Sequence, residues 1–248
     1  MRLDKFLCEQ NIGTRSQVKA QIKKGMVCVN DSIAGRPEQS IDPETDRVSY
    51  QGKEIEYRKF VYYMMHKPAG VITALKDARE KTIMDILPDA LKKQMGKGIF
   101  PVGRLDKDTE GLLLLTNDGE LSHGLLSPKK HVTKTYYVEM DAPAEEAAIR
   151  LLEQGLDIGE KKNNIVQLTM PAKVDLITNQ TFYLTIAEGK FHQIKRMVQA
   201  IGREVIYLKR ISMGPLILNP ELAKGDLREL RSQELEDLLQ YKKDKKQE

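Results

Sequence analysis

The sequence GRLDKDTEGLLLLTNDG, at positions 103–119, places a charged segment directly before four consecutive leucines. A short apolar run bounded by Gly111 and by the turn sequence Asn117-Asp118-Gly119 is typical of a β-strand buried on both faces. The charged residues 104–110 should then form a loop at the end of that strand. Loops carried by a rigid buried element are common positions for chemistry, so this loop is the first place to look for a site.

The sequence around this strand predicts a mixed domain. Further strands are expected at residues 60–65, 136–139, 165–170, 181–187 and 205–208, and helices at 120–126 and 191–201, with a helical stretch at 82–95 interrupted by Pro88. The order mixes strands and helices without a strict βαβ rhythm. This predicts an α+β fold with a mostly antiparallel sheet.

The N-terminal residues predict a second, smaller α/β module. Leu3, Phe6 and Leu7 share one face of a first short helix. Thr14 and Gln17 have the spacing of a capping box at the start of a second helix. Two hairpins follow, with tight turns at Asn30-Asp31 and Gln51-Gly52.

Positive charge is concentrated in this module. The chain carries a net charge of +4, and residues 1–36 alone hold seven basic and three acidic residues. Arg15, Lys19 and Lys23 form one row on the second helix, as phosphate contacts require, although such a row is also common on any solvated helix. The candidate RNA-binding residues are Arg2, Lys5, Arg15, Lys19, Lys23 and Lys24.

Composition excludes several classes of protein. The sequence has no apolar run near the length of a membrane span and no secretory signal. Its cysteines, Cys8 and Cys28, form no CxxC pair, and no dinucleotide, P-loop, zinc-protease or serine-hydrolase motif is present. We therefore expect a soluble cytoplasmic protein that needs no cofactor and no metal.

Asp106 is the candidate reactive group in the charged loop. An aspartate before an apolar run can equally cap a helix or close a turn. Flanked by Arg104 and Lys107, its carboxylate should stay ionised, as a nucleophile or base requires. A buried carboxylate needs a partner. Lys195 and Arg196 are candidates, although on charge alone their segment also reads as an ordinary helix start.

Several blocks of the sequence resemble known families. Residues 2–31 are similar over their full length to the S4 RNA-binding domain, and GRLDKDTEGLLLLTNDG resembles the catalytic motif of the pseudouridine synthases, in particular the RsuA/RluB branch. Lys67-Pro68-Ala69-Gly70-Val71, Lys134-Thr135-Tyr136 and GKFHQIKRM at 189–197 resemble three more motifs of that family, in the family's order. The resemblance covers about residues 1 to 236.

The resemblance implies a role for each site residue. Asp106 corresponds to the family's indispensable aspartate, and Tyr136 to the tyrosine that packs against the target base. Lys195 corresponds to the basic partner of that aspartate. Many members carry Arg there, so Arg196 is the alternative. Arg104 resembles an arginine that helps to hold the flipped nucleotide, although it could equally be a simple phosphate contact. Both Arg104 and Arg196 are candidate substrate-binding residues.

The resemblance also implies an organisation and an activity. It predicts an S4-like domain at residues 1–57, a catalytic domain at 60–236, and a charged, disordered tail at 241–248. The implied activity is isomerisation of a uridine in ribosomal RNA or in a ribosomal subunit assembly intermediate. The protein is expected to be a monomer. The FHQIKRM form is closest to the small-subunit rRNA branch. The same chemistry on large-subunit rRNA or tRNA, and a non-catalytic RNA-binding assembly factor, are the alternatives.

Overall fold

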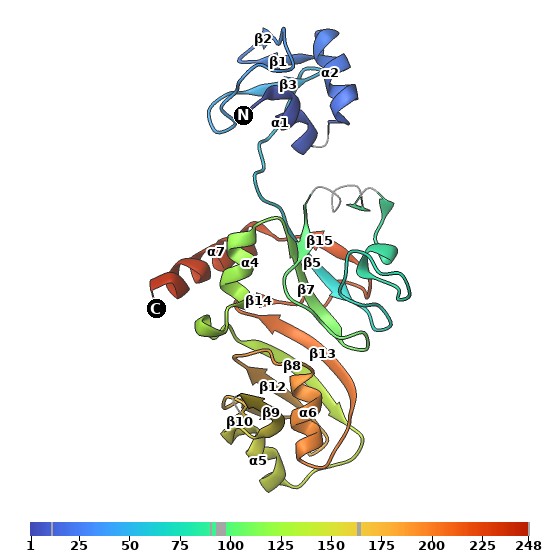
Figure 1. The fold of residues 1–248 in the computed structure, drawn as a ribbon, viewed down its shortest axis with the longest axis vertical. Helices are drawn as coiled ribbons and strands as arrows, with labels where there is room; N and C mark the ends of the chain where they lie inside the picture. Colours follow the sequence, from blue (N-terminus) through green and yellow to red (C-terminus); the bar gives the residue numbers. More distant parts are fainter. Residues whose placement is uncertain (11, 90, 93–97, 163–164, 248) are drawn as a thin grey trace. The chain divides into compact units, whose positions relative to one another are not determined.

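The computed structural model describes residues 1–10, 12–89, 91–92, 98–162 and 165–247. The chain forms two compact units, one containing Met1–Val61 and the other containing Tyr62–Lys92 with Ile99–Glu248. Figure 1 labels the helices and strands that make up each unit. Within these described ranges, no helix has the length and apolar character needed to cross a membrane.

The first unit packs two helices against a small antiparallel sheet. Its elements are α1 (Leu3–Glu9), α2 (Arg15–Lys23), β1 (Val27–Val29), β2 (Ser32–Ile33), β3 (Val48–Tyr50) and β4 (Lys53–Glu54), with strand order β2-β1-β3-β4. Leu3, Phe6, Leu7 and Val18 are among the fully buried residues that join helices to sheet. The predicted apolar face of the first helix is therefore confirmed.

Local backbone chemistry shapes this unit as the sequence predicts. Thr14 and Gln17 form the complete capping box of α2. After the helix, Gly25 adopts a φ of +71°, and the bonds from Gly25 N to Ile22 O and from Met26 N to Gln21 O close the helix end. Both predicted hairpins are present, and the Asn30-Asp31 and Gln51-Gly52 turns have positive φ at both central residues.

The second unit is built on one long mixed sheet. Its strands are β5 (Tyr62–Lys67), β6 (Phe100–Pro101), β7 (Glu110–Thr116), β8 (Lys134–Met140), β11 (Lys173–Leu176), β12 (Thr181–Ile186), β13 (Val205–Met213), β14 (Leu216–Ile217) and β15 (Leu227–Glu229). The order is β11-β12-β8-β13-β7-β5-β15, with β6 on β7 and β14 on β13. Only the β13–β7 pair is parallel among these pairings. The predicted α+β class with a mostly antiparallel sheet is confirmed.

The remaining elements flank this sheet. They are the 3₁₀ turns η1 (Ile83–Ile86) and η2 (Pro128–Lys130), the helices α4 (Gly119–Leu126), α5 (Glu146–Gln154), α6 (Gln193–Ala200) and α7 (Ser232–Gln247), and a separate hairpin of β9 (Asp157–Lys162) and β10 (Ile165–Leu168). The stretch predicted as helical at 82–95 begins as the 3₁₀ turn η1, and its residues 90 and 93–95 lie outside the described residues. The sequence predicted no element at β6, η2, α5, β9, β11, β14 or β15.

The prediction of a disordered tail at 241–248 is wrong for its described part. Helix α7 continues to Gln247. Leu238 is fully buried, and Tyr241 packs against the same apolar cluster. Lys242 lies 3.3 Å from Glu120. A single apolar stripe anchors the helix, although most of its residues are charged or polar.

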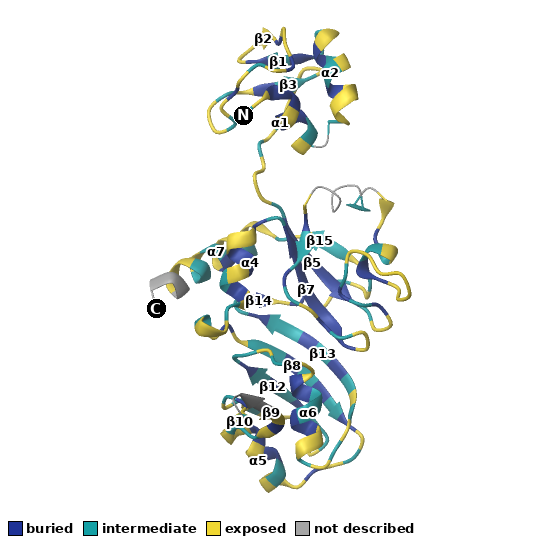
Figure 2. Cartoon of the chain, in the orientation of Figure 1, coloured by how far each residue is buried: buried dark blue, intermediate teal, exposed yellow. Residues whose placement is uncertain are grey.

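The four-leucine run forms the predicted buried strand. All seven residues of β7 are buried (Figure 2). Glu110 is the first residue of that strand and lies buried, so the charged loop ends at Thr109, one residue earlier than predicted. At Gly111 the φ is +109°, and a Cβ would lie 2.2 Å from the carbonyl oxygen of Arg210 on β13. Only glycine permits this close approach of the two strands.

Candidate active site

A buried lysine holds the loop at residues 103–109 through hydrogen bonds to its backbone. Lys67, at the end of β5, is fully buried. Its ammonium donates to the carbonyl oxygens of Asp106 at 2.9 Å, Thr109 at 2.8 Å and Pro68 at 3.0 Å. Burial lowers the pKa of Lys67 to about 8. The lysine therefore fixes the backbone of the loop on both sides of the Asp106 side chain.

Two further contacts complete this support. The hydroxyl of Thr73 donates to the carbonyl oxygen of Leu105 at 2.8 Å and accepts from the Leu105 amide at 3.1 Å. The Gly70 amide donates to the carbonyl oxygen of Lys107 at 2.8 Å. Buried backbone groups need such partners. These bonds also limit the positions that the Asp106 carboxylate can occupy.

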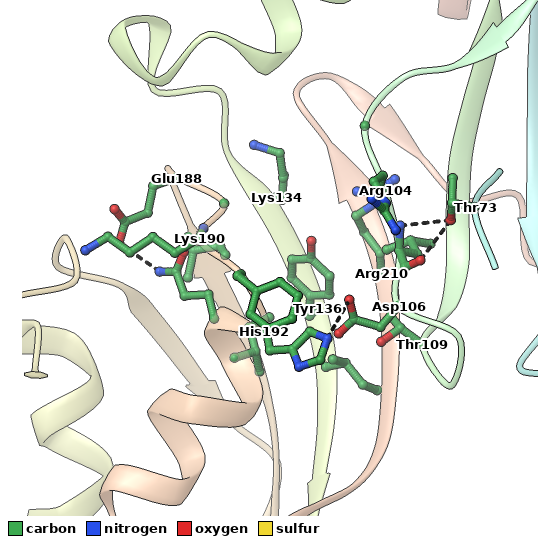
Figure 3. Close-up of a pocket in the computed structure, with 18 of the residues that line it drawn as sticks. Thr73, Arg104, Asp106, Thr109, Lys134, Tyr136, Glu188, Lys190, His192 and Arg210 are labelled. Atoms are coloured by element: carbon green, nitrogen blue, oxygen red, sulfur yellow. Dashed lines mark hydrogen bonds and ion pairs between the residues drawn. The ribbon is translucent and has the colours of Figure 1, made fainter. Parts of the chain in front are cut away.

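Asp106 faces a cavity of about 490 Å³, within the usual size range of small-molecule sites. Figure 3 shows its carboxylate beside His192, with Tyr136 and Lys134 on the neighbouring wall. Tyr136, on β8, is only 9% exposed and pairs across the sheet with Arg210 on β13. The structure thus brings Asp106 and Tyr136 to one cavity from distant parts of the sequence.

The Asp106 carboxylate has two neighbours that could carry positive charge. The Lys195 ammonium, on α6, lies 3.3 Å from one oxygen, and His192 Nε2 lies 3.6 Å from the other. Lys195 also pairs with Asp108 at 2.5 Å. Burial is the largest influence on Asp108 and opposes its ionisation, but the hydrogen bond and the charge of Lys195, with smaller contributions from the backbone and His192, together lower the pKa of Asp108. Lys195 therefore bridges two carboxylates.

Arg196 points elsewhere. Its guanidinium donates to the carbonyl oxygens of Phe191, at 3.1 Å, and of Ile158. Lys195, in contrast, lines the cavity. Successive helix residues project about 100° apart, so only one of the two can face Asp106. The geometry favours Lys195 as the partner and gives Arg196 a bracing contact with the backbone.

Arg104, the other candidate substrate-binding residue, lines the cavity with an exposed side chain. The sequence did not predict the buried polar side chains of Arg210 and Thr109, which also line this cavity. Arg210 is 2% exposed, and its Nη2 and the Thr109 hydroxyl are buried atoms without a hydrogen-bond partner among the described residues. Lys134 also lines the cavity, and burial together with the charge of Arg210 lowers the pKa of Lys134 to about 8. Buried polar atoms without partners suit a polar ligand or water.

The six cations predicted to bind RNA fall into two groups. Arg2 pairs with Asp4 at 2.8 Å, and Lys5 lies 3.7 Å from Glu9. The remaining four, which are Arg15, Lys19, Lys23 and Lys24, form no ion pair with any described carboxylate. Arg15, Lys23 and Lys24 are exposed, and Lys19 is half-buried. The α2 row is therefore available to an anionic partner, whereas Arg2 and Lys5 already have acidic ones.

Two family models match this chain. The RNA pseudouridylate synthase family model matches residues 61–200, and the S4 domain model matches residues 1–48. The chain belongs to the RNA pseudouridine synthase family, whose members are isomerases.

The similarity to known relatives covers nearly the whole chain. An uncharacterized RNA pseudouridine synthase, YtzG of Bacillus subtilis, is 47% identical over 95% of this chain and 97% of its own. Ribosomal small subunit pseudouridine synthase A is 37% identical in Vibrio cholerae and 34% identical in Escherichia coli, each over 95% of this chain and 98% of the relative. A crystal structure of a pseudouridylate synthase superposes with a TM-score of 0.65 at 35% identity, over 96% of this chain and 99% of that one.

Proposed function

We propose that this protein isomerises a specific uridine of small-subunit ribosomal RNA to pseudouridine, with Asp106 as the catalytic carboxylate. One observation carries the site assignment. The Asp106 carboxylate lies on a loop held by hydrogen bonds from Lys67 and Thr73. It faces a cavity lined by the Tyr136 ring and by cationic side chains. The domains performing binding and catalysis are residues 1–57 and 60–236 in this proposal.

The reaction needs no added atoms. The N1–C1′ bond of the uridine breaks, the uracil turns, and C5 bonds to C1′ while its hydrogen is released and N1 is protonated. A base inside a helix is out of reach, so the nucleotide must be flipped out. In this proposal Tyr136, which lines the cavity, stacks on the flipped uracil. Lys195, 3.3 Å from the Asp106 carboxylate, orients that carboxylate. Attack at C1′, removal of the C2′ proton and addition to the base are all open to Asp106.

The choice of RNA rests on the relatives. Those named ribosomal small subunit pseudouridine synthase A align along 95% of this chain, S4 region included. The name of the more similar YtzG specifies RNA but no particular kind of RNA. The proposed substrate is therefore small-subunit rRNA or its assembly intermediate, modified in the cytoplasm by a single chain.

Competing RNA classes test this choice. Wild-type protein would be given small-subunit rRNA, its assembly intermediates, large-subunit rRNA and tRNA, and new pseudouridine would be mapped by carbodiimide adducts that stop reverse transcription. We expect one position in small-subunit rRNA to react about a hundredfold faster than any position elsewhere, a ratio that differential transition-state binding can supply. Faster modification of large-subunit rRNA or tRNA would overturn the substrate while leaving the chemistry intact.

Removing the α2 row should weaken RNA binding without unfolding the first unit. In Arg15→Ala/Lys19→Ala/Lys23→Ala, three cations without ion pairs among the described carboxylates are lost. The slope of log binding constant against log salt should become shallower by about 2, because each phosphate contact contributes about 0.7 to 0.9 to that slope. Filter binding across a salt series measures it.

Lys5→Ala is the matched control, since Lys5 lies on the same unit but beside Glu9. Its salt slope should stay close to that of the wild type. An unchanged slope in the triple variant, with circular dichroism showing a folded protein, would remove α2 from the RNA-binding surface.

A further inference from the structure

Among the side chains that the structure describes, Phe191 is the most exposed large apolar one, at 74%. Phe191 and Asp106 line the same cavity. Single exposed apolar residues are common on protein surfaces. Exposure alone therefore assigns Phe191 nothing, and its surroundings must decide whether it has a role.

The Phe191 ring stacks on a neighbouring ring, and the backbone of residues 191 and 192 is held by hydrogen bonds. The Phe191 and His192 rings lie 3.9 Å apart between centroids and 17° from parallel. His192 has a φ of +48°, in the left-handed region that residues with a side chain adopt uncommonly. Arg196 Nη1 donates to the Phe191 carbonyl oxygen at 3.1 Å, and the Arg196 amide donates to that of His192 at 3.0 Å. An exposed aromatic ring on so constrained a turn can bind a flat partner with little further loss of freedom.

The stack is continuous with the candidate catalytic carboxylate. His192 Nε2 lies 3.6 Å from Asp106 Oδ1 (Figure 3), and the Phe191 ring stacks on that histidine. A nucleotide bound at Asp106 would therefore have its chain neighbour close to the Phe191 ring. Lys195 and Arg104 also line this cavity, and their positive charges suit the phosphodiester backbone of an RNA strand that enters it.

The chemistry of the proposed substrate supplies an occupant for this ring. A uridine flipped into the cavity leaves the base next to it without a stacking partner. Every nucleobase presents a flat face that stacks on an aromatic side chain. The ring would then replace the stacking contact that the flip destroys.

We propose that Phe191, backed by His192, is a stacking platform for the unpaired nucleobase adjacent to the target uridine. This inference rests on the proposed function, because it takes the RNA strand to enter the Asp106 cavity. Phe191 would then be a binding residue that contributes to the choice of RNA, and its exposure would be the consequence of an absent partner.

A mutant cycle between protein and RNA tests the platform. Wild type and Phe191→Ala would be titrated with the small-subunit rRNA fragment that the wild type binds, and with the same fragment made abasic at the nucleotide before or after the target uridine. We expect Phe191→Ala to raise the Kd about tenfold on the intact RNA, as loss of one stacked base does. On one of the two abasic RNAs, Phe191→Ala should raise the Kd less than about twofold. Phe191→Trp should restore wild-type binding.

The readouts separate this idea from others. Ile217→Ala removes a similarly exposed apolar side chain, 65% exposed on β14, and should leave the Kd unchanged. If Phe191 only holds His192 in place, Phe191→Ala would lower kcat equally on all three RNAs and leave Kd alone. That result, or an equal Kd penalty on the intact and both abasic RNAs, would overturn the platform. Because Kd needs no turnover, an inactive but RNA-binding wild type would refute the proposed function separately.

Discussion

Asp106→Asn should abolish turnover, by about a thousandfold or more, while RNA binding is retained. Asparagine keeps the shape of the side chain but can act neither as a nucleophile nor as a base, and loss of such a group removes most of the catalysis of an enzyme. Binding should change little, because phosphate contacts dominate RNA affinity. Single-turnover kinetics and filter binding on the same RNA measure the two quantities.

Asp108→Asn is the matched control for this variant. Asp108 lies two residues away, is 70% exposed, and approaches Lys195 more closely than Asp106 does. Removing its charge should leave activity within about tenfold of wild type, the scale of losing one exposed ion pair. If Asp108→Asn were the inactive variant and Asp106→Asn the active one, the site assignment would be wrong.

Lys67→Met should lower the free energy of unfolding by about 3 kcal/mol or more. Methionine fills a similar volume but removes the ammonium that donates to the carbonyl oxygens of Thr109 and Pro68. Each such group left without its donor costs about 1 to 3 kcal/mol, whereas the Asp106 oxygen keeps the bond from the Thr109 amide. With its support gone, the loop should also lose activity. Urea denaturation followed by fluorescence or circular dichroism measures the change in stability.

Lys107→Met provides the comparison on the same loop. Its side chain is half exposed and pairs with Glu80 at 2.5 Å, so its loss should cost less than about 1 kcal/mol. Equal denaturation midpoints for Lys67→Met and the wild type would show that the buried ammonium does not hold the loop.

Local signals allowed parts of this fold to be predicted. The capping box at Thr14, the Asn30-Asp31 turn and the four-leucine strand each depend on residues close in sequence. Helix α7 was missed because its stability comes from tertiary packing of Leu238 and Tyr241, whereas its sequence is mostly charged or polar. Its local pattern resembles that of a solvated tail.

The candidate site divides in the same way. Asp106 and Tyr136 lie in motifs that could be recognised, and the structure places both at one cavity. The choice between Lys195 and Arg196 depends on the rotation of the helix about its axis. The sequence alone does not determine which of these two adjacent residues faces Asp106. Arg210 carries no sequence signal, since it enters the cavity floor only because β13 pairs with both β7 and β8.

The central claim is that this chain isomerises uridine in small-subunit rRNA. The most direct test is tritium release from that RNA, made with uridine tritiated at C5, because C5 must lose its hydrogen when it bonds to C1′. Purified wild-type protein should release one equivalent of tritium per RNA, matched by one new pseudouridine, and Asp106→Asn should release none. No release by the wild type from naked RNA or from assembly intermediates, despite tight binding, would contradict the account.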